Sequence, residues 1–131
     1  MVCVNPDKVT VKSTGALKYV PGQLAGRYEE LGGTVKYFGK PDPEGFCLCV
    51  DKLGLRPEDV AHVGDSLEHD VAGAVGAGLD VVFIASGIHR AQTGCLHSDS
   101  PEALQAQSEP LQAYLAKHTK LPTYIATAFC V

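Results

Sequence analysis

The chain has 131 residues, of which 45% are hydrophobic and 20% charged, and its formal net charge is −4 at pH 7. A chain of this length is expected to form one globular domain with a core of ordinary size. It contains no basic stretch, which argues against a nucleic-acid partner. No apolar run reaches the roughly 18 residues that a membrane span requires, so we expect no membrane association.

The N-terminus shows no signal-peptide pattern, and the cysteine count is odd. None of the cysteines forms a Cys-x-x-Cys pair, so we interpret all of them as reduced thiols that serve as small apolar residues. This usage favours a cytoplasmic location. The cysteines are Cys3, Cys47, Cys49, Cys95 and Cys130.

The first part of the chain predicts a strand, a loop and a helix. Residues 1–4 form an apolar run that Asn-Pro-Asp ends, as at the end of a strand. Residues 8–21 are polar and are predicted to be a loop, and the helix is expected from Pro21 to Gly32. Its expected inward positions are Leu24, Ala25, Tyr28 and Leu31.

Residues 34–38 predict a second strand, which Gly-Lys-Pro closes. Asp42 is the predicted N-cap of the next helix, and Pro43 suits its first helical position. We expect this helix to end at Gly54. Its expected inward positions are Phe46, Cys47, Val50 and Leu53.

The third strand–helix pair carries two carboxylates. A β-branched run over 60–63 predicts a strand, Gly64-Asp65-Ser66 a tight turn, and residues 67–77 a helix. A near-continuous apolar run over 80–85 predicts a fourth strand, buried on both faces.

The rest of the chain is predicted to be a loop over 87–100, a helix from 101 that Pro110 interrupts or restarts, and a short edge strand over 122–126. Strands and helices alternate with short links, which predicts an α/β fold with a parallel sheet flanked by helices.

Polar side chains collect where the predicted strands end, which is where open parallel sheets bind ligands. Asp65 is placed to ligate Mg²⁺, which prefers carboxylates, waters and substrate phosphate oxygens. Asp70 can accept from backbone N–H groups or hold a metal-bound water, and Lys40 offers a positive charge to a phosphoryl oxygen. The alternative is that Asp65 caps the helix and Asp70 favours its dipole.

The histidines show no metal-ligand spacing, and for each of them a structural or exposed role is favoured over metal ligation. They are His62, His69, His89, His97 and His118.

Several of these segments resemble the haloacid-dehalogenase-like (HAD) hydrolases. Residues 39–43 resemble motif III of that superfamily, and residues 64–74 resemble its motif IV, Gly-Asp-x-x-x-x-Asp before a small-residue helix. Residues 2–7 resemble the strand with Asn-Pro-Asp that returns from the cap domain in the class IIA branch, which includes phosphatases. Residues 84–90 fit the strand and turn after motif IV.

The resemblance covers residues 1–92 and implies a single, partial HAD-like core domain over 1–131, in which residues 93–131 supply a loop, a helix and the edge strand. It implies a Rossmann-like core and Mg²⁺-dependent phosphoryl transfer through an aspartyl-phosphate. Lys40 would be the catalytic lysine, with Asp65 and Asp70 at the metal. A small phosphorylated metabolite would bind at Asn5, Lys40 and Ser66.

One family motif is missing. The sequence contains no Asp-x-Asp, which in the family's motif I supplies the nucleophile on the central strand. The chain is therefore expected to be the C-terminal portion of a HAD-like phosphatase, without the motif I strand and the cap, and to be inactive alone. The strand over 60–63 would then keep an unpaired edge, through which we expect self-association.

Two other interpretations stay open. The chain could be a non-catalytic phosphate- or metal-binding regulatory module derived from the HAD fold. A response-regulator-like receiver fits less well, because Lys40 precedes the Gly-Asp turn and no phospho-acceptor strand follows.

Overall fold

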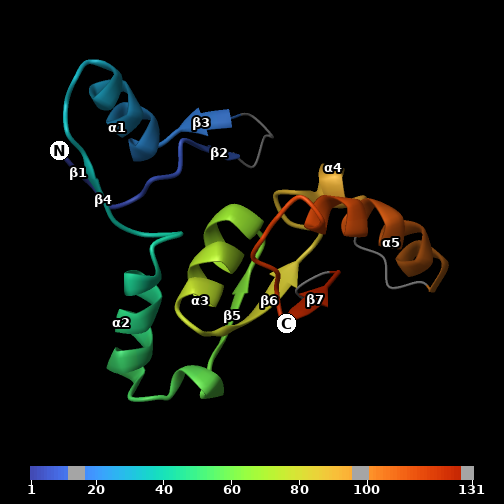
Figure 1. Cartoon of the computed structure of the whole chain (residues 1–131). Helices are drawn as coiled ribbons and strands as arrows, with labels where there is room; N and C mark the ends of the chain where they lie inside the picture. Colours follow the sequence, from blue (N-terminus) through green and yellow to red (C-terminus); the bar gives the residue numbers. More distant parts are fainter. Residues whose placement is uncertain (12–16, 96–100, 128–131) are drawn as a thin grey trace.

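The computed structural model describes residues 1–11, 17–95 and 101–127, and its parallel strands form two sheets (Figure 1). In the first sheet, β1 (Val2–Cys3) pairs with β4 (Lys36–Tyr37). In the second, β6 (Asp80–Ile84) lies between β5 (Ala61–Gly64) and β7 (Tyr124–Ala126). The predicted α/β class with parallel strands and a short C-terminal edge strand is therefore confirmed, but the strands do not join into one sheet.

Helices cover these strands, and the cap of α2 follows the prediction. The Asp42 carboxylate accepts a hydrogen bond from the Glu44 N–H at 3.0 Å, and Gly54 ends the helix with φ at 66°. Such a positive φ favours glycine, because it has no Cβ. The helices are α1 (Pro21–Glu30), α2 (Pro43–Leu53), α3 (Ala72–Gly76), α4 (Arg90–Thr93) and α5 (Pro101–Leu115).

Two predicted loops contain regular structure instead. Within 8–21, β2 (Val9–Val11) and β3 (Leu17–Tyr19) pair as an antiparallel hairpin, since the alternating Val-Thr-Val segment suits a strand. Residues 12–16 between them lie outside the described residues. Within 87–100, α4 forms a short helix.

The helix α5 continues through Pro110 without interruption, so the predicted break is wrong. It packs against α4, where Pro110 faces Gly94, and a Cβ on Gly94 would lie 3.3 Å from the proline ring. Packing of this kind routinely overrides the local preference of a proline.

The core lies around β6 and the helix that precedes it. Its fully buried side chains include Leu67, Val71, Val81 and Phe83. The inward positions predicted for α1 are mostly wrong, because α1 packs against β1, a strand of only two residues. Of these predicted positions only Ala25 is buried, whereas Leu24 is 68% exposed, and Leu53 of α2 is exposed as well.

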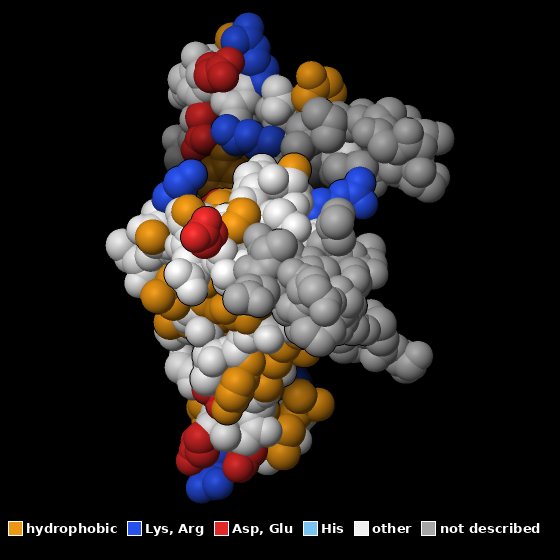
Figure 2. All heavy atoms as spheres, turned by 90° about the vertical axis from the view of Figure 1, so that its right-hand side faces the viewer, with side chains coloured by type: hydrophobic (Ala, Val, Ile, Leu, Met, Phe, Trp, Pro, Cys, Tyr) orange, Lys and Arg blue, Asp and Glu red, His pale blue; other side chains and the backbone are white. Residues whose placement is uncertain are grey.

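Exposed groups follow the predictions in part. Figure 2 shows apolar side chains spread along the middle of one face, with charged groups toward both ends. Cys3 and Cys95 are buried free thiols, as predicted, but Cys47 and Cys49 are exposed on α2. Cys130 and His97 lie outside the described residues. Among the described helices, none is long and apolar enough to cross a membrane.

Candidate functional site

The turn that follows β5 brings the two predicted carboxylates to one place. Asp65 and Ser66 follow Gly64, and a π-helical turn over Leu67–Val71 then leads into α3. A Cβ on Gly64 would collide with the Asp70 side chain. Glycine at this position therefore lets the carboxylate of Asp70 lie directly over the end of the strand, where it is 4% exposed.

Asp70 accepts from four donors. Its Oδ1 lies 2.8 Å from Lys40 Nζ and 3.2 Å from His62 Nε2. Its Oδ2 accepts from the backbone N–H groups of Asp65 at 3.2 Å and Ser66 at 3.1 Å. Both carboxylate oxygens of Asp70 therefore accept hydrogen bonds from the chain itself. Lys40 and Asp70 are in contact although they are 30 residues apart in the sequence.

These contacts hold Asp70 in its charged form. Burial raises the pKa of the carboxyl group, but the hydrogen bonds from Lys40, His62 and the Ser66 N–H, together with the charge of Lys40, outweigh burial, so the pKa lies below the ordinary 3.8. The aspartate is therefore ionised at neutral pH and keeps Lys40 beside the turn.

Asp65 is placed differently, because one of its oxygens remains open. Its Oδ2 accepts from the backbone N–H of Ile88 at 3.0 Å. Within the described part of the chain, no donor meets the other oxygen, Oδ1. A Cβ on Gly87 would collide with Asp65, so this glycine allows the close approach of the loop after β6.

Ser66, predicted to bind substrate, is 3% exposed and caps the π-helical turn. Its Oγ accepts from the His69 N–H at 3.2 Å and lies 3.1 Å from His69 Nδ1. Asp7 Oδ1 lies 3.8 Å from the same nitrogen. Because the hydroxyl and the carboxylate face one ring nitrogen rather than opposite ones, these three residues are not arranged as a nucleophile relay.

Asn5 lines a cavity together with Lys40. Its side-chain oxygen accepts from the Asp7 N–H at 3.0 Å, as in an Asx turn. Asn5, Asp7 and Lys40 line one cavity of about 400 Å³. The structure thus brings Asn5 and Lys40 to a common space, and the Lys40–Pro41 peptide beside it is cis.

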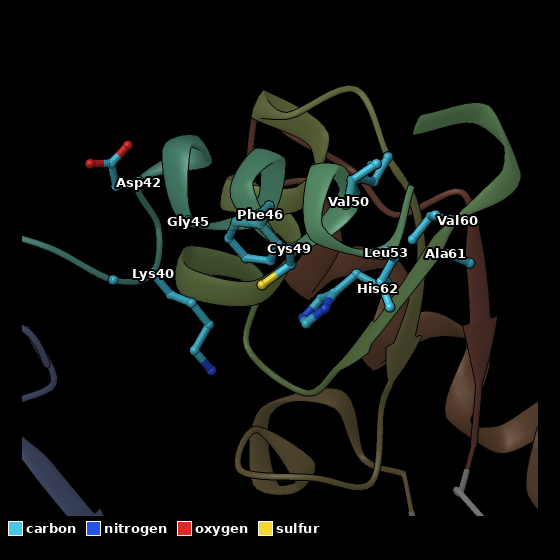
Figure 3. A pocket seen from close by; sticks show the side chains of 12 residues that line it. Lys40, Asp42, Gly45, Phe46, Cys49, Val50, Leu53, Val60, Ala61 and His62 are labelled. Carbon is cyan, nitrogen blue, oxygen red and sulfur yellow. The ribbon is translucent and has the colours of Figure 1, made fainter. Parts of the chain in front are cut away.

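A second, apolar cavity of about 290 Å³ lies between α2 and β5 (Figure 3). The Phe46 and His62 rings meet edge to face at its wall, with centroids 5.0 Å apart. Sequence reasoning gave His62 only a structural role in the strand. The alternation of side chains along a strand could have indicated the position of His62, because it puts residues 62 and 64 on the same face.

Mg²⁺ fits this donor set through one carboxylate. The ion commonly takes one or two protein carboxylates and completes its shell with water and substrate phosphate oxygens. The open oxygen of Asp65 meets that need, whereas an ion at Asp70 would displace one of its donors. No group of three or more His, Cys, Asp or Glu within the described ranges is arranged to hold a metal ion.

Comparison with known proteins shows the same kind of fold. A p-nitrophenyl phosphatase from Archaeoglobus fulgidus matches with a TM-score of 0.63 and 25% identity, over 97% of this chain and 42% of that one. NagD from E. coli K-12 matches with a TM-score of 0.65 and 22% identity, over 96% of this chain and 42% of its own.

Sequence relatives are phosphatases as well. A dihydroxyacetone phosphatase of Corynebacterium glutamicum is 32% identical over 88 residues, which is 66% of this chain and 32% of that protein. A phospholysine phosphohistidine inorganic pyrophosphate phosphatase of Xenopus laevis is 36% identical over 52 residues, or 40% of this chain and 19% of the relative. The chain thus spans less than half the length of each of these proteins.

The model of one protein family matches residues 37–110, more than half of the chain. This range contains Lys40, the turn with Asp65 and Asp70, and the loop that contacts Asp65. The predicted resemblance is thereby confirmed: the chain belongs to the HAD-hydrolase-like family.

Proposed function

We propose that this chain supplies the lysine and the metal-ligating carboxylate of a magnesium-dependent phosphoryl-transfer site for small phosphorylated metabolites. One observation carries the proposal: Lys40 Nζ lies 2.8 Å from Asp70 in the same turn as Asp65, at the carboxyl ends of parallel strands. The sequence relatives are phosphatases by name, one of them a dihydroxyacetone phosphatase, and this supports the substrate class.

Each residue has a separate role in this proposal. Lys40, whose side chain is 48% exposed, has ammonium hydrogens beyond the one that meets Asp70 and binds a phosphoryl oxygen. Asp65 ligates Mg²⁺ through its open oxygen, and the bound ion supplies positive charge to the phosphate group. Asp70 keeps Lys40 in place, and Asn5 faces substrate across the shared cavity.

The chain by itself is proposed to bind these ligands without turning substrate over. It contains no Asp-x-Asp to provide a nucleophilic carboxylate for the covalent step. A non-catalytic binding module would use the same Lys40 and Asp65 contacts, so binding and turnover have to be measured separately.

Calorimetric titration with MgCl₂, and with inorganic phosphate in the presence of MgCl₂, tests the binding. We expect Asp65→Asn to abolish the Mg²⁺ heat and Lys40→Met to abolish the phosphate heat. Asp51→Asn and Lys52→Met change exposed residues of α2 in the same way and should bind like the wild type. Equal Mg²⁺ binding by wild type and Asp65→Asn would contradict the metal assignment.

Turnover is tested with p-nitrophenyl phosphate and MgCl₂. We expect no release of p-nitrophenol above a protein-free control. Hydrolysis by the 131-residue chain that Asp65→Ala abolishes would contradict the proposed inactivity and leave the ligand assignment intact.

A further inference from the structure

A second cluster of ionisable side chains surrounds Glu68, one turn from the proposed metal ligand. Glu68 Oε1 lies 3.0 Å from His118 Nε2, and Glu68 Oε2 lies 3.2 Å from His89 Nε2. The Tyr114 ring lies against both imidazoles, with centroid distances of 5.2 Å to His89 and 5.0 Å to His118. These residues come from three separate parts of the chain and meet only in the folded structure.

The cluster is built from mostly buried rings. The side chains of His89 and His118 are 17% and 19% exposed, and Tyr114 is 7% exposed. Burial, helped by the nearby Glu68, raises the pKa of Tyr114 to about 12. Burial also raises the pKa of Glu68, but the hydrogen bond from His118, a backbone hydrogen bond and the nearby His89 together outweigh it, so the net shift is downward.

His118 fastens Glu68 to the end of α5. Its Nδ1 lies 3.1 Å from the Tyr114 backbone carbonyl, while its Nε2 faces the Glu68 carboxylate. The Tyr114 carbonyl of α5 therefore orients the His118 ring, and the ring holds the Glu68 carboxylate. Ser66 adds a third contact, since its hydroxyl lies 3.4 Å from Glu68 Oε2.

His89 links Glu68 to Asp65. It follows Ile88 directly, and the Ile88 N–H donates to Asp65 Oδ2 at 3.0 Å. The 3.2 Å contact between Glu68 Oε2 and His89 Nε2 thus holds the backbone that orients the Asp65 carboxylate. Among the described residues, His89 Nε2 has no hydrogen-bond partner, so its close contact with Glu68 is what fixes this side of the ring.

We propose that Glu68 is a positioning residue: by bridging His89 and His118, it anchors the loop over 86–89 and sets the orientation of Asp65. The proposal rests on Asp65 as the metal ligand of the proposed function. Glu68 does not touch the ion or the substrate. Residues that orient metal ligands in this way typically change metal affinity by about 10- to 100-fold when removed.

The expected effect is local rather than global. Glu68 is 47% exposed, and exposed ion pairs add little to the stability of the whole fold. Loss of Glu68 should therefore free the loop and leave the core intact. Amide hydrogen exchange separates these effects, because Ile88 reports the loop and Phe83, fully buried in β6, reports the core.

The test compares Glu68→Ala and Glu68→Gln with Glu109→Gln, which removes an exposed carboxylate of α5. In Glu68→Ala we expect the Ile88 amide to exchange about tenfold faster, with Phe83 unchanged, and the Kd for Mg²⁺ to rise about tenfold. Glu68→Gln keeps an acceptor for His118 and should show smaller changes of the same sign. Glu109→Gln should match the wild type in both measurements.

Each alternative outcome has a definite meaning. Equal acceleration at Ile88 and Phe83 would make Glu68 an ordinary stabilising residue and overturn the proposal. Unchanged exchange at Ile88 would overturn it as well. A wild type that binds no Mg²⁺ would refute the proposed function, while the exchange rates of Ile88 would still decide whether Glu68 positions the loop.

Discussion

Replacing Asp70 with Ala should destabilise the fold by more than an ordinary surface change. The carboxylate is 4% exposed and accepts from two backbone N–H groups, from Lys40 and from His62. Alanine cannot accept from any of them, and the methyl group leaves the space over Gly64 unfilled. The effect should appear in the free energy of unfolding measured by urea denaturation at neutral pH.

The backbone donors dominate the expected magnitude. A buried N–H group left without an acceptor costs about 1–3 kcal/mol, and the Ser66 N–H is buried while the Asp65 N–H is partly exposed. Lys40 is half-exposed and regains water, so its ion pair adds little. We therefore expect a loss of about 3 kcal/mol in Asp70→Ala.

Asp70→Asn is the matched control, because its amide oxygen can still accept from the two N–H groups. It should lose less, about 1–2 kcal/mol, since only the charge and the Oδ1 contacts with Lys40 and His62 are removed. The two variants together separate the backbone contribution from the charge.

Acid should reduce the difference between wild type and Asp70→Asn. The folded-state pKa of Asp70 lies below 3.8, so the carboxylate stabilises the fold above that pH, and this contribution is lost as the pH falls through the folded-state pKa. Denaturation curves at neutral pH and near pH 3 measure the change. A loss below about 0.5 kcal/mol in Asp70→Ala, the range of ordinary surface substitutions, would refute the reasoning.

Two further predictions concern the glycine behind Asp65 and the edge of β5. Gly87→Ala places a Cβ against Asp65, so the Kd for Mg²⁺ should rise about tenfold in calorimetry. Gly26→Ala is the control, because its Cβ meets no heavy atom within 4 Å, and it should leave the Kd unchanged. Equal Mg²⁺ affinity of the wild type and Gly87→Ala would contradict the proposed role of the loop. In the described residues β5 pairs with β6 alone, so sedimentation velocity should show association that grows with concentration and that Val63→Lys, but not Leu31→Lys, removes. A wild type that stays monomeric at all concentrations would refute this.

The strand–turn–helix around Asp65 could be predicted because its local rules agree. A β-branched run, a Gly-Asp turn and small helical residues each favour the same structure. Lys40 was expected beside the acids because one parallel sheet would bring the strand ends together, and it lies there although β4 and β5 belong to separate sheets. The π-helical first turn was not predicted, because the sequence over 67–77 has an ordinary helical pattern.

The cluster around Glu68 could not be predicted from the sequence. Glu68 and His118 are 50 residues apart in the sequence. The spacing of the residues in the helix near 101–115 and of the histidines did not indicate a contact with the turn at residues 65–70. Each histidine was weighed alone and assigned a structural or exposed role. What places them together is the docking of α5 on α4, and such long-range packing leaves no short sequence motif.

The structure also gives different roles to the two acids that the family resemblance placed together at the metal. Asp70 has both oxygens engaged, so it is suited to hold Lys40 and the backbone of the turn rather than to take a new ligand. Asp65 is held by one backbone N–H and keeps one oxygen open, so it is suited to bind a cation. The two glycines agree with this division, because Gly64 makes room for Asp70 and Gly87 for Asp65. A substitution at Asp70 should therefore act mainly on stability, whereas one at Asp65 should act mainly on ligand binding.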